Sequence, residues 1–250
     1  MHKTLLKDLK LEAFPASVRA LMEKALVYDS SCGDAARVYY IDSGFYVKEA
    51  AKGSLSHEAE MGRLFHGHRL GPEVVLYASG EKDYLVTKEV AGQDLCHYTD
   101  KPELICRQMA EKLRLLHSIP CEDAPPAPAF ALYERTLSGQ ISQADFEKYV
   151  LLDSFSIASK EEAWALVQEK KQELRQDVLI HGDACLPNMM MEKGQITSFI
   201  DFSCSGRGDL HMDLFWAVWS LAFNLKTEKY TDYFLDSYGR QRMDFDRLRL

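Results

Sequence analysis

Two aspartates and an asparagine in the last third of the chain could together carry out a reaction. Asp183 and Asn188 lie in the run Ile180-His181-Gly182-Asp183-Ala184-Cys185-Leu186-Pro187-Asn188, and Asp201 follows Phe199-Ile200. Carboxylate and amide oxygens are the ligands that Mg²⁺ prefers in proteins. A further carboxylate can orient a hydroxyl group and accept its proton. The trio therefore predicts transfer of a phosphoryl group from a nucleotide bound with Mg²⁺ to a hydroxyl.

The spacing within this trio separates a catalytic loop from an ordinary turn. Gly-Asp pairs are common in turns, so Asp183 alone would be interpreted as a turn residue. Asn188, however, stands five residues after Asp183, which is the spacing of the protein-kinase catalytic loop His-Arg-Asp-x-x-x-x-Asn. Asp201 follows a strand that we expect over 196–200. Both features favour the catalytic interpretation, whereas His181 is expected to hydrogen-bond the loop backbone.

Lys48 is the candidate for holding the α- and β-phosphates of the nucleotide. It ends an expected strand, Phe45-Tyr46-Val47, and a helix follows. Kinases position such a lysine with a glutamate on a helix, and Glu58 and Glu60 are both candidates. A solvated lysine at a strand end is the alternative, and the two glutamates favour the functional interpretation.

Two further segments are candidates for nucleotide contacts. The loop Ser30-Ser31-Cys32-Gly33-Asp34-Ala35 joins two expected strands, and its backbone N–H groups, including those of Gly33 and Asp34, could cradle phosphate. The chain has no Walker A sequence. Lys88-Glu89-Val90 follows a strand, so Lys88 and Val90 are expected to present backbone groups to the base.

Composition limits the classes of partner. Of the 250 residues, 46% are hydrophobic and 27% charged, and the net charge is −8. This charge argues against a nucleic-acid partner and suits a cationic small ligand. The six cysteines show no Cys-x-x-Cys spacing, so we expect free thiols in the cytoplasm. No signal peptide or membrane span is indicated.

The pattern of apolar residues divides the chain into two parts. Residues 4–26 have helical spacing broken at Pro15. Short β-branched and aromatic runs between 27 and 87 then predict five antiparallel strands, with one helix over 54–69 inserted. Further helices are expected over 102–117, within 131–175, and over 209–225 and 228–238. We therefore predict an α+β fold with two lobes, 1–91 and 92–250, and a nucleotide held between lobes.

Together these motifs resemble the aminoglycoside phosphotransferases, especially the 3′-phosphotransferase (kanamycin kinase) branch. The resemblance covers nearly the whole chain, and it rests on residues 181–188, 199–201, 205–209 and 114–119, and on Asp213, Lys48 and Glu60. It implies a bilobal protein-kinase-like fold with a small sheet-rich N-terminal lobe and a larger, mainly helical C-terminal lobe.

The resemblance also implies a role for each matching residue. Asp183 would be the catalytic base, and Asn188 and Asp201 would bind Mg²⁺. Lys48 would pair with Glu60 rather than Glu58, because Glu60 aligns with the family's helix when counted against Arg63-Leu64-Phe65.

The same resemblance implies roles for two more aspartates and the identity of the two substrates. Asp209 and Asp213 would brace the catalytic loop and cap the next helix. The donor would be ATP, with GTP as an open alternative. The acceptor would be a polycationic aminoglycoside, contacted by Asp145 and Glu147. We expect a monomer or weak dimer.

The chain departs from the family pattern in three places. Phe202-Ser203-Cys204 follows Asp201, where the branch has an apolar residue or Cys and then Gly-Arg, so an arginine that stabilises charge is missing. The stretch Gln143-Ala144-Asp145-Phe146-Glu147-Lys148-Tyr149 is less acidic than its counterpart. The acidic, aromatic tail of the branch is also missing after Leu250, so either the chain is naturally short or residues are lacking.

These departures leave alternatives open. The leading hypothesis is phosphorylation of an aminoglycoside hydroxyl, at the 3′ position, which confers antibiotic resistance. A second hypothesis keeps the kinase and changes the acceptor to a small hydroxyl metabolite such as choline or homoserine. A third is a nucleotide-binding module with little transferase activity.

Overall fold

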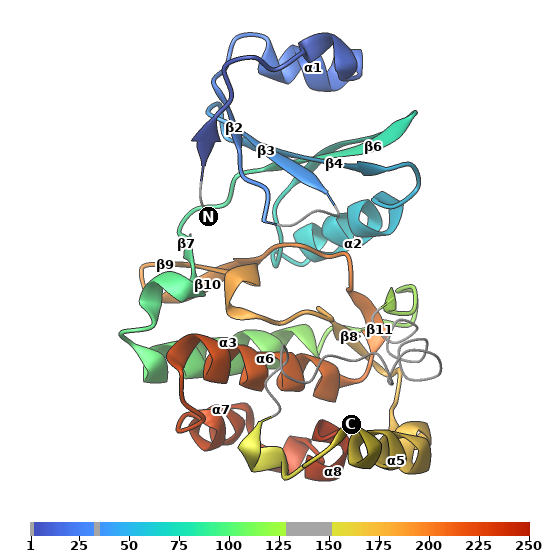
Figure 1. The fold of residues 1–250 in the computed structure, drawn as a ribbon, viewed down its shortest axis with the longest axis vertical. Coiled ribbons are helices and arrows are strands. Elements are labelled where there is room, and N and C mark those ends of the chain that lie inside the picture. Colours follow the sequence, from blue (N-terminus) through green and yellow to red (C-terminus); the bar gives the residue numbers. More distant parts are fainter. Residues whose placement is uncertain (1–2, 33–35, 129–151) are drawn as a thin grey trace. The chain divides into compact units, whose positions relative to one another are not determined.

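A computed structural model describes residues 3–32, 36–128 and 152–250 of the chain (Figure 1). The chain divides into two compact units. One comprises Met1–Ala91 with Ser198–Ser203, and the other comprises Gly92–Thr197 with Cys204–Leu250. The sequence predicted one division after residue 91. The structure differs by one segment, because the residues around Asp201 pack as part of the first unit.

The first unit is built on a six-stranded antiparallel sheet in the order β1-β2-β3-β4-β6-β5. The strands are β1 Thr4–Leu5, β2 Val27–Asp29, β3 Arg37–Ile41, β4 Phe45–Ala51, β5 Val74–Ser79 and β6 Lys82–Lys88. The sequence predicted five strands for this sheet, one fewer than the structure has.

The additional strand lies where the sequence predicted one helix, broken at Pro15, over 4–26. Thr4 and Leu5 instead pair with β2, and a 3₁₀ turn follows at Leu11–Ala13. Only Ala16–Met22 forms an α-helix, α1, directly after Pro15. Proline is tolerated at a helix start, where its missing N–H is not needed. The prediction is wrong for the first part of this segment, because pairing with β2 at the sheet edge satisfies the backbone groups of Thr4 and Leu5.

The two faces of this sheet carry different side chains. Val47 belongs to a core that also contains Val18 and Met22 of α1. Helix α2, Ser56–Gly67, covers the other face, where Leu85 packs against Ala59. Figure 1 shows α1 and α2 on opposite sides of the sheet. Because neighbouring side chains on a strand point to opposite faces, Lys48 lies on the α2 face.

The second unit is mainly helical. Its helices are α3 Pro102–Leu116, α5 Lys160–Lys170, α6 Leu210–Leu225, α7 Thr231–Tyr238 and α8 Phe245–Leu248. The predicted apolar face of α3 is confirmed, since Ile105, Met109, Leu113 and Leu116 are fully buried. In the part of the chain that the structure describes, no helix has the length and apolarity needed for a membrane span.

Two small sheets frame the loop that carries Asp183. Their strands are β7 Gln93–Asp94, β8 Val178–Ile180, β9 Met189–Glu192, β10 Gln195–Phe199 and β11 Gly206–Gly208, in the orders β10-β9-β7 and β11-β8. After β8 the chain passes through 181–185 into a 3₁₀ turn, Leu186–Asn188, and continues directly as β9. Asp183 and Asn188 thus lie between β8 and β9, each of which is paired within a different sheet.

Candidate functional site

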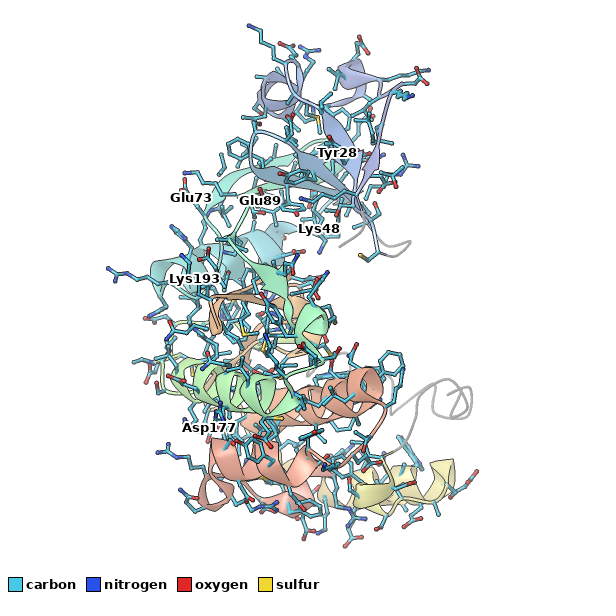
Figure 2. All side chains as sticks on the ribbon, turned by 90° about the vertical axis from the view of Figure 1, so that its left-hand side faces the viewer. Tyr28, Lys48, Glu73, Glu89, Asp177 and Lys193 are labelled. Carbon is cyan, nitrogen blue, oxygen red and sulfur yellow. The ribbon has the colours of Figure 1, made fainter. Side chains whose placement is uncertain are left out.

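Lys48 is the centre of a charged cluster in the first unit. Its Nζ atom lies 2.8 Å and 3.0 Å from the two carboxylate oxygens of Glu58 on α2. The same atom lies 3.2 Å from Oδ1 of Asp201. Lys48 projects from the sheet of this unit (Figure 2). The structure therefore brings together the predicted phosphate lysine and one predicted metal ligand.

The predicted pairing of Lys48 with Glu60 is wrong. Helix α2 begins at Ser56, and its buried residues include Glu58, which is 5% exposed. Glu60 is exposed to solvent. Because successive helical residues are rotated by about 100°, two residues that are two positions apart point to nearly opposite sides. Only Glu58 can therefore turn toward the sheet.

Charge and burial together determine the protonation of this cluster. Burial would lower the pKa of the Lys48 ammonium, but the carboxylates of Glu58 and Asp201 outweigh it and raise that pKa above its ordinary value. Burial raises the pKa of the Glu58 carboxyl, and the Lys48 ammonium opposes this rise. Lys48 is consequently held as a cation, the form that attracts phosphate oxygens.

Asp183 and Asn188 form a hydrogen-bonded pair in the second unit. The Asn188 amide nitrogen donates to the Asp183 carboxylate at 2.8 Å and to its carbonyl oxygen at 3.0 Å. The backbone N–H of Cys185 donates to the same carbonyl at 2.8 Å. The Asp183 carboxylate is thereby held in one orientation. Because Asn188 uses its nitrogen here, its amide oxygen is the atom suited to a cation.

The buried carboxylate of Asp213 is hydrogen-bonded to the backbone of this loop. Asp213, on α6, accepts hydrogen bonds from the backbone N–H groups of His181 at 2.8 Å and Gly182 at 2.7 Å. His117 Nε2 lies 3.1 Å from the same carboxylate. The His181 ring itself accepts from the Asp183 N–H at 3.3 Å. Asp213 and His181 thus hold the backbone of the loop that carries Asp183.

Asp209 holds the start of α6. It is the N-cap residue and accepts from the His211 N–H at 2.9 Å. Its carboxylate also accepts from the Arg175 N–H at 2.7 Å and pairs with Arg247 of α8. Burial would raise the pKa of Asp209, but its hydrogen bonds with His211 and Arg175 outweigh burial and lower that pKa.

Two supporting residues were not predicted from the sequence. Ser220, inside α6, accepts from the Leu186 N–H of the 3₁₀ turn at 2.9 Å. His117, at the end of α3, holds Asp213 and also contacts the Tyr238 hydroxyl at 2.8 Å. The only sequence signal for Ser220 is its position as a polar interruption in an apolar helix, and such a signal names no partner.

The remaining predicted contacts have different outcomes. The Lys88 N–H donates to the Glu73 carbonyl and its ammonium pairs with the Glu73 carboxylate, so both groups are used within the first unit. Val90 is half-buried after the end of β6. Gly33, Asp34, Asp145 and Glu147 lie outside the described residues.

Comparison with known proteins decides the family. The sequence model of the phosphotransferase enzyme family matches residues 33–250. A protein of Lactococcus lactis subsp. lactis (strain IL1403), named probable aminoglycoside 3′-phosphotransferase, is 38% identical over 258 residues, which cover 99% of this chain and 97% of that protein. The chain belongs to the phosphotransferase enzyme family.

Solved structures resemble this phosphotransferase throughout. The crystal structure of an aminoglycoside-3′-phosphotransferase of type VIII has a TM-score of 0.72 at 24% identity, covering 92% of this chain and 94% of that one. An aminoglycoside phosphotransferase from Streptomyces rimosus, in complex with ADP and streptomycin, has a TM-score of 0.66 at 22% identity, covering 87% and 90%. The predicted α+β, bilobal, protein-kinase-like fold is confirmed.

Cys185 lies two residues after Asp183 in this phosphotransferase, and its thiol is not a nucleophile. Cys185 is 8% exposed. Burial and the neighbouring Asp183 raise the pKa of its thiol far above the ordinary value. Because the thiolate is the nucleophilic form, Cys185 stays neutral and serves the loop by packing.

Glu58→Gln should weaken nucleotide binding, whereas Glu60→Gln should not. Glu58 contributes two charge-assisted hydrogen bonds to Lys48, and a bond to a charged group contributes about 1.5–3 kcal/mol. We expect the KM for ATP to rise about tenfold or more in Glu58→Gln. The matched variant Glu60→Gln removes the same charge from the exposed side of α2. Equal effects of both variants in steady-state kinetics would contradict the assignment of Glu58.

Gly182→Ala should destabilise the protein at the loop that carries Asp183. Gly182 has φ +80°, and a Cβ atom there would clash with the Cys204 carbonyl oxygen. Gly194 has φ +81° with no atom within 4 Å of its Cβ position. Gly194→Ala thus costs only the backbone strain, about 1–2 kcal/mol. We expect Gly182→Ala to lose at least about 2 kcal/mol more in chemical denaturation, because overpacking is added. Equal losses would contradict the close contact.

Proposed function

We propose that this phosphotransferase transfers the γ-phosphate of ATP to a hydroxyl group of an aminoglycoside, at the 3′ position, and so confers antibiotic resistance. The aminoglycoside acceptor is inferred from the similarity to the Lactococcus lactis protein, whose name states that activity. This chain matches that protein over nearly its full length. GTP is the alternative donor. We further propose that the enzyme acts in the cytoplasm as a monomer or weak dimer.

Each residue of the two clusters then has a chemical role. Asp183 orients the acceptor hydroxyl and accepts its proton as the bond to phosphorus forms. Lys48, held by Glu58, binds the α- and β-phosphates. Asn188 and Asp201 would supply oxygen ligands for Mg²⁺, whose charge would offset that of the phosphates. The fit of this ion is supported by the donor chemistry, since an amide oxygen and a carboxylate are hard ligands.

The residues proposed for the acceptor site are chosen for their negative charge. Aminoglycosides are polycations, and the chain carries a net charge of −8. We assign Asp145 and Glu147 to the acceptor, because they are the acidic residues of the segment that corresponds to the acceptor-binding stretch of the family. Carboxylates beside a polycation add attraction and speed its association.

A pair of acceptors tests the proposal. We expect turnover of kanamycin and no turnover of an analogue that lacks the 3′ hydroxyl, measured by release of ADP in a coupled assay with Mg·ATP. Similar rates with both compounds would refute the 3′ assignment. The same assay with ATP and GTP at matched concentrations decides the donor.

A second acceptor class follows from the composition of the acceptor segment. Residues 143–149 contain only two acidic side chains, Asp145 and Glu147. A smaller hydroxyl compound with a single cationic group, of the choline kind, would need no more. Turnover of such a compound, with none across an aminoglycoside panel, would favour this alternative.

A further inference from the structure

The lysine just before β1 contacts two side chains on one face of the first sheet. The Lys3 ammonium lies 3.1 Å from the centroid of the Tyr40 ring and 3.3 Å from one carboxylate oxygen of Glu89. The Tyr40 hydroxyl donates a hydrogen bond to the other oxygen of Glu89 at 3.0 Å. Lys3, Tyr40 and Glu89 thus form a closed group, the N-terminal clasp, in which each side chain contacts the other two.

The clasp lies on the face of the sheet that carries the phosphate lysine. Tyr40 on β3 is paired with Tyr46 on β4, and their ring centroids are 5.0 Å apart. The Lys3 ammonium lies 5.4 Å from the Tyr46 ring centroid. Tyr46 stands two residues before Lys48, and alternate residues of a strand share one face at a rise of about 3.3 Å per residue. The Tyr46 ring therefore lies between the clasp and the lysine proposed for the phosphates.

Glu89 also lies where the base of the nucleotide is expected. It follows β6 directly (Figure 2) and is flanked by Lys88 and Val90, the two residues predicted to present backbone groups to the base. Its own backbone N–H donates to the Gly44 carbonyl at 2.8 Å. Strand β6 ends at Lys88, so the ladder of the sheet does not extend to Val90. The side-chain contacts of Glu89 thus hold this segment at the point where the strand ends.

The Tyr40 hydroxyl keeps its proton within the clasp. Burial and the hydrogen bond to Glu89 raise the pKa of this hydroxyl above its ordinary value, so it remains a donor at neutral pH. A partly exposed ion pair is weak by itself. A cation over an aromatic ring adds attraction, and a hydrogen bond to a carboxylate is stronger than one between neutral groups. Three contacts that share their groups therefore hold Glu89 more firmly than an ion pair with Lys3 alone.

We propose that Lys3 and Tyr40 are positioning residues of the donor site, which hold Glu89 so that the backbone on either side of it meets the base of the nucleotide. The inference rests on the proposed use of ATP or GTP as donor. It adds that the segment leading into β1, a strand that the sequence did not predict, supports this site. Neither Lys3 nor Tyr40 touches the base or the phosphates in this role.

Four substitutions in the full chain test the clasp. Lys3→Met removes the ammonium and keeps a long side chain, whereas Lys3→Arg keeps a cation for Glu89 and for the Tyr40 ring. Tyr40→Phe removes only the hydroxyl, and Glu89→Gln removes the charge while an oxygen remains to accept a hydrogen bond. Lys7→Met is the matched control, because Lys7 is exposed and lies outside the clasp. The readouts are ADP affinity by calorimetry, kcat, the KM values for ATP and kanamycin, and the melting temperature.

We expect Lys3→Met and Tyr40→Phe to weaken ADP binding and to raise the KM for ATP by about three- to tenfold, because one contact to a charged group is worth on the order of a factor of ten. The kcat value and the KM for kanamycin should stay within about twofold of the wild type, since Asp183 is unchanged. Lys3→Arg should recover most of the loss, and Lys7→Met should match the wild type. Lys3→Met combined with Glu89→Gln should weaken binding little more than Lys3→Met alone. Tyr40→Phe carries the comparison if Lys3→Met does not fold.

Four results would overturn the proposal. One is wild-type ADP affinity in Lys3→Met, even where the melting temperature falls, because the clasp would then serve stability alone. Another is tighter ADP binding in Lys3→Met, which would show that the ammonium competes with the base for the tyrosine rings. The third is full additivity of Lys3→Met and Glu89→Gln, and the fourth is a lower kcat with an unchanged KM for ATP. A wild-type enzyme that binds ADP but phosphorylates no aminoglycoside would refute the proposed acceptor and leave this inference standing.

Discussion

Asp183→Asn is expected to reduce kcat by about 10³-fold or more, while the affinity for Mg·ATP stays within about twofold of the wild type. A positioned general base contributes about 10²–10⁴-fold, and in the proposed mechanism Asp183 also orients the hydroxyl that attacks phosphorus. Asparagine keeps the shape of the side chain and a carbonyl oxygen. The hydrogen bond from Asn188 can therefore persist while the proton acceptor is lost.

The measurement combines steady-state kinetics with nucleotide binding by calorimetry. Asp177→Asn is the matched control, because it removes the same charge from the second unit. Asp177 is exposed and lies just before β8 (Figure 2). We expect the control to retain wild-type kcat. Wild-type turnover by Asp183→Asn, in folded protein, would refute the mechanism.

Asp201→Asn is expected to reduce kcat/KM by an amount on the order of 10³-fold, which corresponds to about 4 kcal/mol. Metal-ion stabilisation of transferring phosphate charge is worth several kcal/mol, and the variant loses the charged oxygen ligand proposed for Mg²⁺. Lys48 retains Glu58 as a partner, because that ion pair does not depend on Asp201. Nucleotide binding without Mg²⁺ should therefore survive.

Titration with Mg²⁺ separates this effect from a general defect. Asp201→Asn should require a higher Mg²⁺ concentration for half-maximal rate, and excess Mg²⁺ should restore part of the activity. Glu81→Gln removes a charge from the exposed turn between β5 and β6 in the same unit and serves as the control. An unchanged Mg²⁺ requirement in Asp201→Asn would contradict its role as a ligand.

The sequence predicted the elements around the active residues because their signals are local. Asp183 and Asn188 lie in one short loop between strands, and the strand before Asp201 has its own apolar pattern. The expected face of α3 followed from apolar spacing alone. The segment 4–26 had an equally regular spacing, yet Thr4 and Leu5 pair with β2. Sheet pairing involves residues distant along the chain, which local spacing does not register.

Side-chain types and their spacing along the chain were sufficient to predict a kinase reaction and its candidate residues, because Asp183, Asn188 and Asp201 end strands or lie between them. Partner choice was different. Whether Glu58 or Glu60 reaches Lys48 depends on where α2 begins and how it is rotated over the sheet. Phe202 fits the apolar position that the family pattern has after Asp201, but only the fold shows that its ring packs on Phe65 and beside Gly71. Such contacts follow from three-dimensional packing, since the groups that meet are far apart in the chain.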